Sequence, residues 1–267
     1  MIDTKSAKLN LILKELGSCA IAFSGGVDSS FLLNRAHTIL KSGIIAITIR
    51  TPYIPSSEIE EAIEFTKAFG IKHKIVDIAF PDLIKNNPVE WCYLCKKTLF
   101  TELLTFAGAN HYKYVIDGTN SEDTGDFSPG MKALQEMGIR SPLLESGMTK
   151  KEIRELSRTA GLDVWDKPAM ACLLTRIPYE TDVKDGTVRM IEAAESMLFD
   201  KGYPGSRVRV HGDVASIECI PGYMEKIIHS PDREHITTSL KKIGFRYVSL
   251  DLDGYKTGSS NPENIVQ

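Results

Sequence analysis

The fold is decided by one stretch near the N-terminus, Cys19-Ala20-Ile21-Ala22-Phe23-Ser24-Gly25-Gly26-Val27-Asp28-Ser29-Ser30. Its first five residues form a compact apolar run that is typical of a buried strand, and the two glycines come soon after that run. Apolar residues then recur at helical spacing from Asp28 to Leu40. The stretch therefore predicts a strand, a glycine-rich loop and a helix in direct succession.

Short apolar runs alternate with helical patterns from this stretch to about Leu162. We expect further strands at 44–49, 73–78 and 112–116 and a helix that begins at Ser56-Ser57-Glu58. A capping box at Thr149–Glu152 predicts one more helix, which Gly161 ends. This alternation predicts an α/β fold with a doubly wound parallel sheet.

The pattern changes after about residue 183. A helix at 188–198, strands at 207–211 and 214–220, a helix at 232–243 and a strand at 247–252 together predict a small α+β domain. We therefore expect two domains, residues 1–183 and residues 184–267.

Composition excludes several classes of protein. The chain has 267 residues, 42% of them hydrophobic and 25% charged, so wholesale disorder is excluded. Its net charge of −3 gives no overall electrostatic footprint for nucleic acid or an anionic membrane. The N-terminus lacks the features of a secretory signal, and no run of 18 apolar residues occurs. We expect a cytoplasmic protein that binds neither nucleic acid stably nor membrane.

The glycine turn suits a phosphate group. Its main-chain N–H groups can converge on an anion, and the start of the following helix favours negative charge. The Walker signature is absent. Because Gly-Gly before Asp-Ser also fits a plain strand-to-helix turn, the residues alone favour pyrophosphate binding without excluding that turn.

Five cysteines are too few, and odd in number, for a disulfide framework. Cys92 and Cys95 form a C-x-x-C motif that fits a redox pair, half of a zinc site or part of an iron–sulfur site. With Cys172, three thiolates would suit a [4Fe–4S] cluster with one open iron, whereas separately buried or reactive thiols are the alternative. Cys19 and Cys219 lie in apolar runs and are expected in the core.

The stretch Ser24–Ser29 resembles the S-G-G-x-D-S signature of the PP-loop ATP pyrophosphatases, which have an adenine nucleotide alpha hydrolase-like fold. These enzymes split ATP into AMP and pyrophosphate while they adenylate an oxygen of the substrate. The resemblance implies that ATP and Mg²⁺ bind here, with the phosphates held by Ser24, Gly25, Gly26, Asp28 and Ser29. Thr48 and Arg50, at the end of the second predicted strand, are candidates for adenosine contact or ordinary strand-end residues.

Further motifs extend from end to end of the chain. They are Trp91–Lys96, Asp117–Asn120 with Asp123 and Gly125-Asp126, Arg140–Leu143, Lys167-Pro168, Ala171–Leu173, Arg176–Tyr179, Arg207–Arg209, His211–Asp213 and Gly254-Tyr255. With them the chain resembles the LarE family of pyridinium-3,5-biscarboxylic acid mononucleotide sulfurtransferases, which help to build the nickel-pincer nucleotide cofactor of lactate racemase. Ser128 and Lys256 stand where arginine is expected, which puts anion contacts at these two positions in doubt.

The LarE resemblance also implies roles for individual residues. Gly118, Asp123 and Arg140 would contact ATP, and Cys172 and Asp28 would be catalytic. In one version of the chemistry, Cys92, Cys95 and Cys172 hold a [4Fe–4S] cluster whose open iron carries sulfide, and the presence of all three favours this version. In the other version, Cys172 gives up its own sulfur and becomes dehydroalanine.

Five side chains are candidates for contact with the mononucleotide: Trp91, Arg176, Glu195, Arg207 and Arg209. Arg207 and Arg209 alternate with valines on a predicted strand, so both point to one face and could hold a phosphate or carboxylate. The alternatives are a solvated strand face for the two arginines, a core position for Trp91 and a solvated helix face for Glu195. The resemblance implies a homo-oligomer and an external sulfide source as partners.

Three other functions compete with this interpretation. A tRNA thiolase shares the PP-loop, but the acidic composition counts against it. A nucleotide-binding regulatory module would keep the loop without the chemistry. A two-thiol redox protein would use Cys92 and Cys95 and would not need Cys172.

Overall fold

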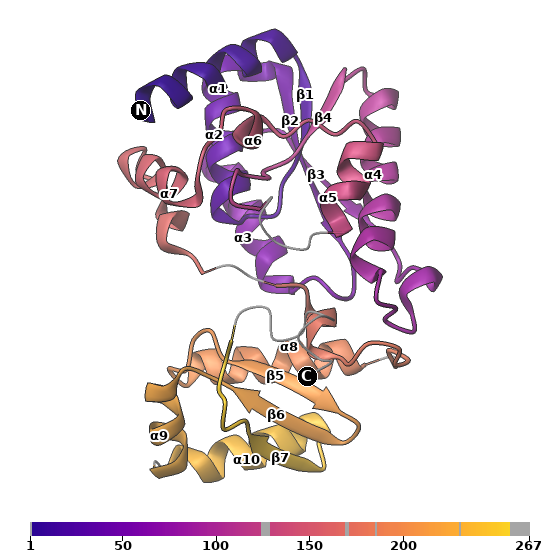
Figure 1. Ribbon diagram of the computed structural model, residues 1–267, viewed down its shortest axis with the longest axis vertical. Coiled ribbons are helices and arrows are strands. Elements are labelled where there is room, and N and C mark those ends of the chain that lie inside the picture. The colour runs from indigo at the N-terminus through magenta and orange to yellow at the C-terminus, as the bar shows by residue number, and fades with distance from the viewer. Residues whose placement is uncertain (1, 124–128, 169–170, 185, 230, 257–267) are drawn as a thin grey trace. The chain divides into compact units, whose positions relative to one another are not determined.

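The computed structural model describes residues 2–123, 129–168, 171–184, 186–229 and 231–256 (Figure 1). The predicted motif at Gly125-Asp126 and the departure at Ser128 lie outside these residues. The chain forms two compact units. Unit 1 comprises Met1–Leu83 and Glu90–Met170, and unit 2 comprises Ile84–Val89 and Ala171–Gln267.

A four-stranded parallel sheet forms the centre of unit 1. Its strands are β1 (Cys19–Ala22), β2 (Ile44–Arg50), β3 (His73–Asp77) and β4 (Tyr114–Ile116), in the order β3-β2-β1-β4. The chain builds outward from β1 in one direction through β2 and β3, and then returns to place β4 on the other side of β1. The predicted doubly wound α/β sheet is confirmed, and the strand order reverses between β1 and β4, where open sheets of this type bind ligands.

Helices cover both faces of this sheet. Helices α2 and α4 lie on opposite faces, and α1 packs on α2 (Figure 1). The helices are α1 (Ile2–Leu16), α2 (Val27–Leu40), α3 (Ser56–Ala68), α4 (Trp91–Ala109), α5 (Pro129–Glu136), α6 (Pro142–Glu145) and α7 (Lys150–Thr159), with 3₁₀ turns η1 (Lys41–Gly43), η2 (Asp82–Ile84) and η3 (Asp163–Asp166). Leu9, Leu13, Ile21, Leu32 and Leu33 lie in the core that α1, α2 and the sheet bury together, and each is fully buried.

Local signals predict the ends of several elements correctly. Thr149 caps α7 through a complete capping box with Glu152, as expected. The sequence analysis did not predict α4, the longest helix among the described residues. Besides its buried side chains, α4 carries apolar residues such as the exposed Leu104 on other sides, so no clear apolar stripe marks it.

Unit 2 contains a three-stranded mixed sheet. Strand β5 (Arg207–His211) is antiparallel to β6 (Val214–Glu218), which pairs in parallel with β7 (Tyr247–Leu250). Helices α8 (Thr187–Asp200), α9 (Pro221–His229) and α10 (Asp232–Ile243) and the 3₁₀ turn η4 (Leu173–Arg176) complete the unit. The small α+β arrangement expected for this part of the chain is present.

The predicted boundary at residue 183 falls inside unit 2, because η4 packs on α8 and β5. The short segment 84–89 belongs to the same unit. Asn87 is 1% exposed, and its side-chain amide donates to the carbonyl oxygens of Ile177 (2.8 Å) and Pro178 (3.1 Å). A patterning argument along the chain does not reveal such a contact between distant segments.

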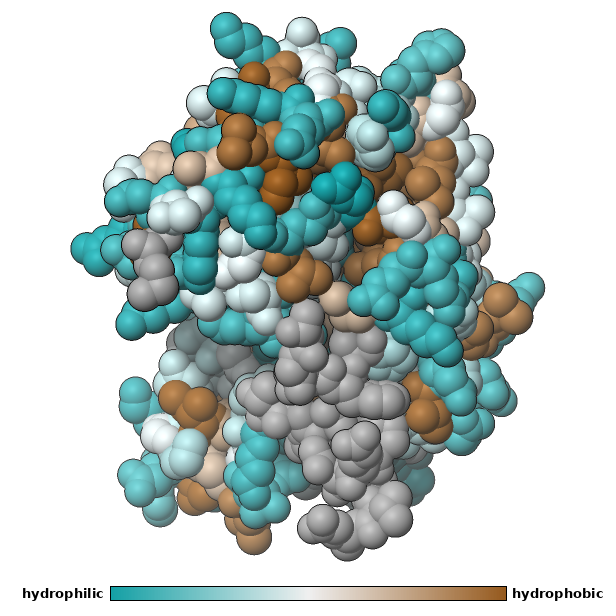
Figure 2. Space-filling model, turned by 45° about the horizontal axis from the view of Figure 1, so that its top comes forward, coloured by the Kyte–Doolittle hydropathy of each residue, from teal (hydrophilic) through white to brown (hydrophobic). Residues whose placement is uncertain are grey.

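On the face drawn in Figure 2, hydrophilic side chains are interspersed with apolar patches. Among the described residues, no helix has the length and apolar character needed to cross a membrane. Cys19 and Cys219 are fully buried in β1 and directly after β6, which confirms that both are core residues.

Candidate active site

The glycine loop after β1 encloses a cavity of about 240 Å³ at the N-terminus of α2. Ser24, Gly26, Asp28 and Ser29 line this cavity, which we call the phosphate cavity. The hydroxyl oxygens of Ser24 and Ser29 lie 3.1 Å apart, and Ser29 Oγ donates to the carbonyl oxygen of Gly26 (3.1 Å). Because the first N–H groups of a helix have no partner within it, α2 presents donors to an anion bound here.

Two glycines are required by the geometry of this cavity. Gly25 has a φ of +71°, a left-handed conformation that glycine adopts without strain. Gly118 follows β4, and a Cβ atom at this position would lie 2.9 Å from the main-chain nitrogen of Ser29. The loop after β4 therefore approaches the start of α2 too closely for any side chain at residue 118, and both predicted glycines line or shape the site.

A second cavity of about 340 Å³ opens beside the first at the carboxyl ends of β1, β2 and β4. The exposed surface of its lining is mainly apolar. The apolar positions are Ala22, Phe23, Ile47, Ile49, Ile54, Ile59, Phe100 and Leu103, and the polar and glycine positions are Ser24, Ser29, Thr48, Glu58, Lys96, Asp117, Gly118, Thr119 and Asp123. Its size and apolar lining suit a nucleobase with its ribose. We call it the base cavity.

Thr48 lines the base cavity, but its hydroxyl is already engaged. Thr48 Oγ1 donates to the carbonyl oxygen of Phe23 (2.7 Å) and lies 2.8 Å from His73 Nε2. His73 Nδ1 in turn lies 2.9 Å from Thr66 Oγ1. Burial lowers the pKa of His73. Thr48 thus contributes to the wall of the cavity through a hydrogen-bonded chain behind it.

Asp28 points into the phosphate cavity opposite a lysine. Lys150 Nζ forms an ion pair with Asp28 Oδ2, while Oδ1 is buried without a hydrogen-bond partner among the described residues. Burial raises the pKa of Asp28, and Lys150 opposes that shift. A buried carboxylate oxygen with no protein donor is the kind of ligand that Mg²⁺ takes, so the residues present fit the metal implied by the PP-loop.

No site role was predicted for two lysines at this cavity, although one of them belongs to the Lys167-Pro168 motif. Lys150 and Lys167 both line it, and Lys167 forms an ion pair with Glu61 and lies 3.4 Å from the carbonyl oxygen of Gly25. A signal for Lys150 was present, because Lys150 and Lys151 occupy the first turn of α7, where the helix dipole disfavours cations. A lysine in such a place indicates an anionic group nearby.

The other residues predicted to contact ATP divide into two groups. Asp123 lines the base cavity, and its carboxylate accepts a hydrogen bond from the main-chain nitrogen of Asn120 (2.8 Å). Arg50 instead pairs with the exposed Asp77 on β3, with Nη2 2.9 Å from Oδ2, and Arg140 pairs with Glu145. Neither arginine lines either cavity. These two predictions are not supported by the geometry, because each side chain has an acidic partner on its own part of the surface.

The C-x-x-C motif lies in the first turn of α4, so both cysteines share one side of the helix. The sulfur of Cys95 lies 3.2 Å from the hydroxyl oxygen of Tyr53. Burial raises the pKa of Cys95 to about 11 and also raises the pKa of Cys92, whose sulfur accepts a hydrogen bond from the main chain of Gly130. The two thiols are therefore neutral at pH 7 unless a cation binds them.

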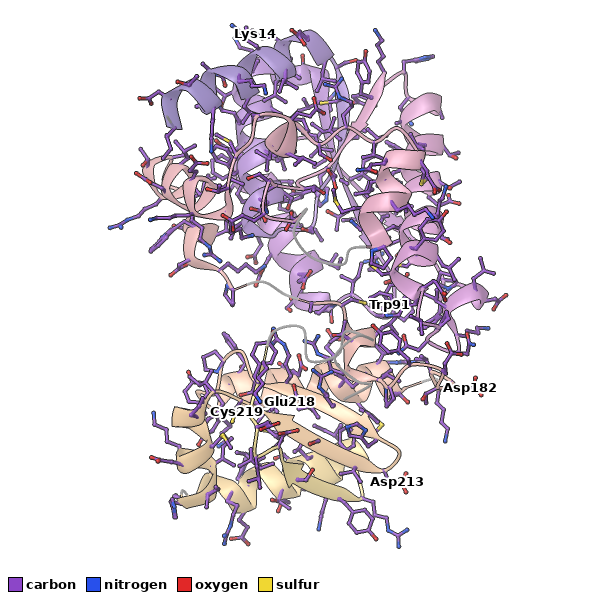
Figure 3. The ribbon with its side chains drawn as sticks, in the orientation of Figure 1. Lys14, Trp91, Asp182, Asp213, Glu218 and Cys219 are labelled. Carbon is purple, nitrogen blue, oxygen red and sulfur yellow. The ribbon has the colours of Figure 1, made fainter. Side chains whose placement is uncertain are left out.

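Trp91 is the first residue of α4, and its side chain is buried (Figure 3). It lines neither of the two cavities. Cys172 lies in unit 2, as the N-cap of η4, and is half-buried. Within the described residues, no group of three His, Cys, Asp or Glu side chains is placed to hold a metal ion. Two of the three cysteines expected as cluster ligands therefore lie together on α4, and the third lies in unit 2.

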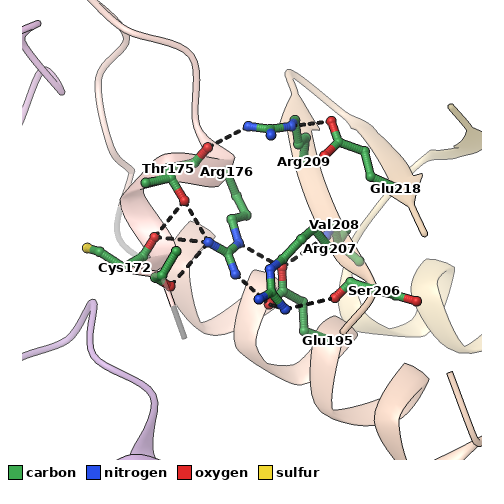
Figure 4. Close-up of polar contacts among 10 residues, drawn as sticks. Cys172, Thr175, Arg176, Glu195, Ser206, Arg207, Val208, Arg209 and Glu218 are labelled. Carbon is green, nitrogen blue, oxygen red and sulfur yellow. Dashed lines mark hydrogen bonds and ion pairs between the residues drawn. The ribbon is translucent and has the colours of Figure 1, made fainter. Parts of the chain in front are cut away.

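Unit 2 gathers three arginines around two glutamates (Figure 4). Arg176 pairs with Glu195 through Nε (2.8 Å) and Nη2 (3.0 Å). Arg207 Nη1 lies 3.9 Å from the same carboxylate, and Arg209 pairs with Glu218 on β6. The cluster therefore holds three guanidinium groups in a largely buried place, each within ion-pair distance of a glutamate.

Glu195 and Arg207 do not have the solvated surroundings that were the alternative to substrate contact. Glu195 does not lie on a solvated helix face, because it is largely buried and accepts a hydrogen bond from the main-chain nitrogen of Val208 (3.0 Å). Arg207 is likewise buried, with its guanidinium 5.5 Å from the ring centre of Tyr255. Burial and the neighbouring Arg176 lower the pKa of Arg207. The strand face that carries the two arginines is thus packed rather than solvated.

Comparisons with known proteins agree with this geometry. Residues 12–101 match the family model described as asparagine synthase. The chain is 34% identical over 263 residues to the pyridinium-3,5-bisthiocarboxylic acid mononucleotide synthase of Lactiplantibacillus plantarum, which covers 97% of this chain and 95% of that protein. The chain belongs to the LarE family.

This LarE-family chain is also similar to other proteins, over its full length or over part of it. An uncharacterized protein of Synechocystis is 36% identical over 264 residues, with 98% of each chain covered. A tRNA-specific 2-thiouridylase of Clostridium botulinum is 25% identical over 189 residues, which is 57% of this chain and 52% of that protein. The LarE-family chain is therefore an enzyme of the PP-loop ATP pyrophosphatase type, and the predicted PP-loop fold and family resemblance are confirmed.

Proposed function

We propose that this enzyme transfers sulfur to a carboxylate of pyridinium-3,5-biscarboxylic acid mononucleotide, with ATP as the activating reagent, in the biosynthesis of the nickel-pincer nucleotide. The observation that carries the proposal is the phosphate cavity, in which a glycine turn, two serines and Asp28 meet at the switch point of the sheet. The full-length similarity to a protein named as the bisthiocarboxylic acid mononucleotide synthase supports the choice of substrate.

Activation of the carboxylate comes first, because its own leaving group would be oxide. A carboxylate oxygen of the mononucleotide attacks the α-phosphorus of ATP, the bond from that phosphorus to the bridging oxygen breaks, and pyrophosphate leaves with the electron pair. The serines and the N–H groups of α2 hold the phosphates. When bound, Mg²⁺ neutralises phosphate charge, and Asp28 would hold it through the oxygen that has no protein donor among the described residues.

Sulfur transfer then completes the reaction. A sulfur nucleophile attacks the acyl carbon, the carbon–oxygen bond to AMP breaks, and a thiocarboxylate results. We propose that Cys92, Cys95 and Cys172 hold a [4Fe–4S] cluster, which supplies an open iron that carries sulfide. The paired thiols on α4 support this choice, because the sulfur of Cys95 lies 3.2 Å from the Tyr53 hydroxyl oxygen and the sulfur of Cys92 accepts a hydrogen bond from the main chain of Gly130.

The mononucleotide is anionic, since it bears two carboxylates and a phosphate around one pyridinium charge. We propose that Arg207 and Arg209 attract one of these anions, because strand β5 places both guanidinium groups in one cluster of unit 2. Trp91 is buried at the start of α4, which supports a core role at least as well as stacking on the substrate.

One experiment tests this function and its sulfur source together. Anaerobically reconstituted enzyme is mixed with ATP, Mg²⁺ and the biscarboxylic acid mononucleotide, and pyrophosphate, thiocarboxylate and intact protein mass are measured. We expect pyrophosphate release that depends on the mononucleotide, with unchanged protein mass and with bound iron and labile sulfide.

Two outcomes would overturn parts of the proposal. A protein that loses one sulfur and two hydrogens per turnover would show that Cys172 is sacrificed: its thiolate would attack the acyl carbon, and elimination would leave dehydroalanine. Absence of any pyrophosphate release that depends on the mononucleotide would remove the substrate assignment itself.

A further inference from the structure

The chain around Cys172 is held by one buried arginine. Arg176 Nη1 donates to the carbonyl oxygens of Ala171 (3.1 Å) and Cys172 (3.2 Å) and to Thr175 Oγ1 (2.6 Å) (Figure 4). The two carbonyls belong to the peptide groups on either side of the Cys172 Cα atom. Fixing both peptide groups fixes the direction of the Cα–Cβ bond of Cys172, which restricts its sulfur to the three staggered positions about that bond.

The other two nitrogens of Arg176 also bind a protein group. Nε and Nη2 both bind the carboxylate of Glu195 on α8, and the Arg176 side chain is only 3% exposed. A guanidinium has five N–H donors, so at most one is left for a substrate. Arg176 therefore serves the protein rather than a bound anion, in contrast to its expected role in substrate contact.

The partner of Arg176 extends the framework to the sheet of unit 2. Glu195 Oε1 also accepts a hydrogen bond from the main-chain nitrogen of Val208 on β5 (3.0 Å). Arg209, on the same strand, donates to the carbonyl oxygen of Thr175 (2.7 Å). The C-terminal end of the turn that carries Cys172 is thus anchored to α8 and β5, and Arg176 links the N-terminal end of the turn to that anchor.

We propose that Arg176 and Glu195 are positioning residues, a clamp that sets the direction of the Cys172 sulfur for the transfer step. The proposal rests on the proposed role of Cys172 in sulfur transfer. It assigns neither residue to the mononucleotide. A misplacement of about 1 Å at a reacting group costs on the order of 100-fold in rate, so the clamp matters even though it touches no substrate.

The decisive variant is Arg176→Lys, which keeps the charge but cannot reach Glu195 and two carbonyls together. We expect the rate of thiocarboxylate formation to fall about 100-fold. In a single turnover, the dissociation constant of the mononucleotide and the rate of pyrophosphate release, which precedes the action of Cys172, should change less than twofold. Combining Arg176→Lys with Cys172→Ala should give no loss in thiocarboxylate formation beyond that of Cys172→Ala alone.

A second readout does not depend on activity. Hydrogen exchange at the amides of Thr175 and Ile177, which bond to the carbonyls of Cys172 and Leu174, should become at least about tenfold faster in Arg176→Lys. Exchange in β5 and β6 should stay unchanged. The control is Arg35→Lys, which breaks a comparable hydrogen bond to Asn10 in unit 1 and should leave the exchange at Thr175 and Ile177 as it is.

The possible outcomes distinguish a failure of the clamp proposal from a failure of the proposed function. If wild-type enzyme fails to release pyrophosphate with the mononucleotide, the function fails, and hydrogen exchange still tests the clamp. If Arg176→Lys raises the dissociation constant of the mononucleotide while the transfer rate stays within twofold, Arg176 binds substrate and the clamp is wrong. Should Arg176→Lys not fold, Glu195→Gln, which removes one half of the paired contact, decides by the same measurements, with an expected tenfold loss in transfer rate.

Discussion

The candidate anion-binding sites of the two units are built from different groups. In unit 1 the phosphate cavity is built from main-chain groups, because a glycine turn and the start of α2 surround it and Gly118 allows a second loop to approach. In unit 2 the charge lies on side chains, three arginines held by two glutamates from different elements. The comparison teaches that a site made of main chain depends on a few local residues, whereas a site made of side chains depends on packing between distant ones.

The largest effect is expected from a substitution that prevents the close approach of the loop after β4 to the start of α2 in unit 1. In Gly118→Ala the new methyl group would lie 2.9 Å from the main-chain nitrogen of Ser29, where neither loop nor helix can yield cheaply. We expect ATP affinity to fall about 100-fold and the free energy of unfolding to fall by about 2 kcal/mol. Isothermal titration with ATP and chemical denaturation measure the two effects.

Gly108→Ala is the matched control for this substitution, because a Cβ atom there would meet nothing within 4 Å. It should leave ATP affinity unchanged. Equal ATP affinity in Gly118→Ala and the wild type would mean that the loop after β4 does not limit the phosphate cavity, and the main-chain account of unit 1 would be wrong.

A smaller effect on ATP affinity is expected from Lys150, a cation that lines the phosphate cavity of unit 1. Lys150→Met removes the partner of Asp28 from the phosphate cavity. ATP affinity should fall about tenfold, since one charge-assisted contact to phosphate is lost. Lys151→Met is the control, because Lys151 is exposed on the same turn of α7 and lines neither cavity. Titration of both variants with ATP in the presence of Mg²⁺ gives the ratio of their dissociation constants for ATP.

If Lys150→Met and Lys151→Met lose affinity equally, Lys150 acts only through the general positive charge of the first turn of α7. The Lys150 side chain would then have no specific part in the cavity, and the site of unit 1 would depend on main-chain donors, the two serines, Asp28 and Lys167.

The difference between the units also explains what the sequence could predict. The strand, glycine loop and helix at 19–40 are fixed by neighbouring residues, so their approximate bounds and the glycine turn of the phosphate cavity follow from local pattern. Lys150 and Asp28 are 122 residues apart, and their meeting depends on how α7 packs on α2. In the same way, Arg176 reads as a substrate contact in the sequence, whereas in the structure its donors turn toward Glu195 and the main chain. The acidic partners of Arg50 and Arg140 likewise could not be chosen from the sequence alone, and the predicted ATP contacts of these two arginines remain predictions.

The smallest expected effect concerns the wall of the base cavity and depends on pH. Burial lowers the pKa of His73, which lies between Thr48 and Thr66, so the folded state favours neutral imidazole. Below the ordinary histidine pKa of about 6.5, the unfolded state binds a proton more readily than the folded state, and stability is lost as the pH falls. The wild-type free energy of unfolding should therefore drop by at most about 1 kcal/mol more than that of His73→Gln between pH 7 and pH 5.5.

Chemical denaturation of the two proteins at both pH values measures this difference. His211→Gln serves as the control, because His211 is exposed at the end of β5 in unit 2, and its replacement should keep the wild-type pH dependence. A His73→Gln protein with the same pH dependence as the wild type would mean that the imidazole takes up its proton without disturbing the chain of hydrogen bonds behind Thr48. The wall would then tolerate a charge, and the base cavity of unit 1 would owe its apolar character to Phe23, Phe100 and the isoleucines rather than to a neutral histidine behind Thr48.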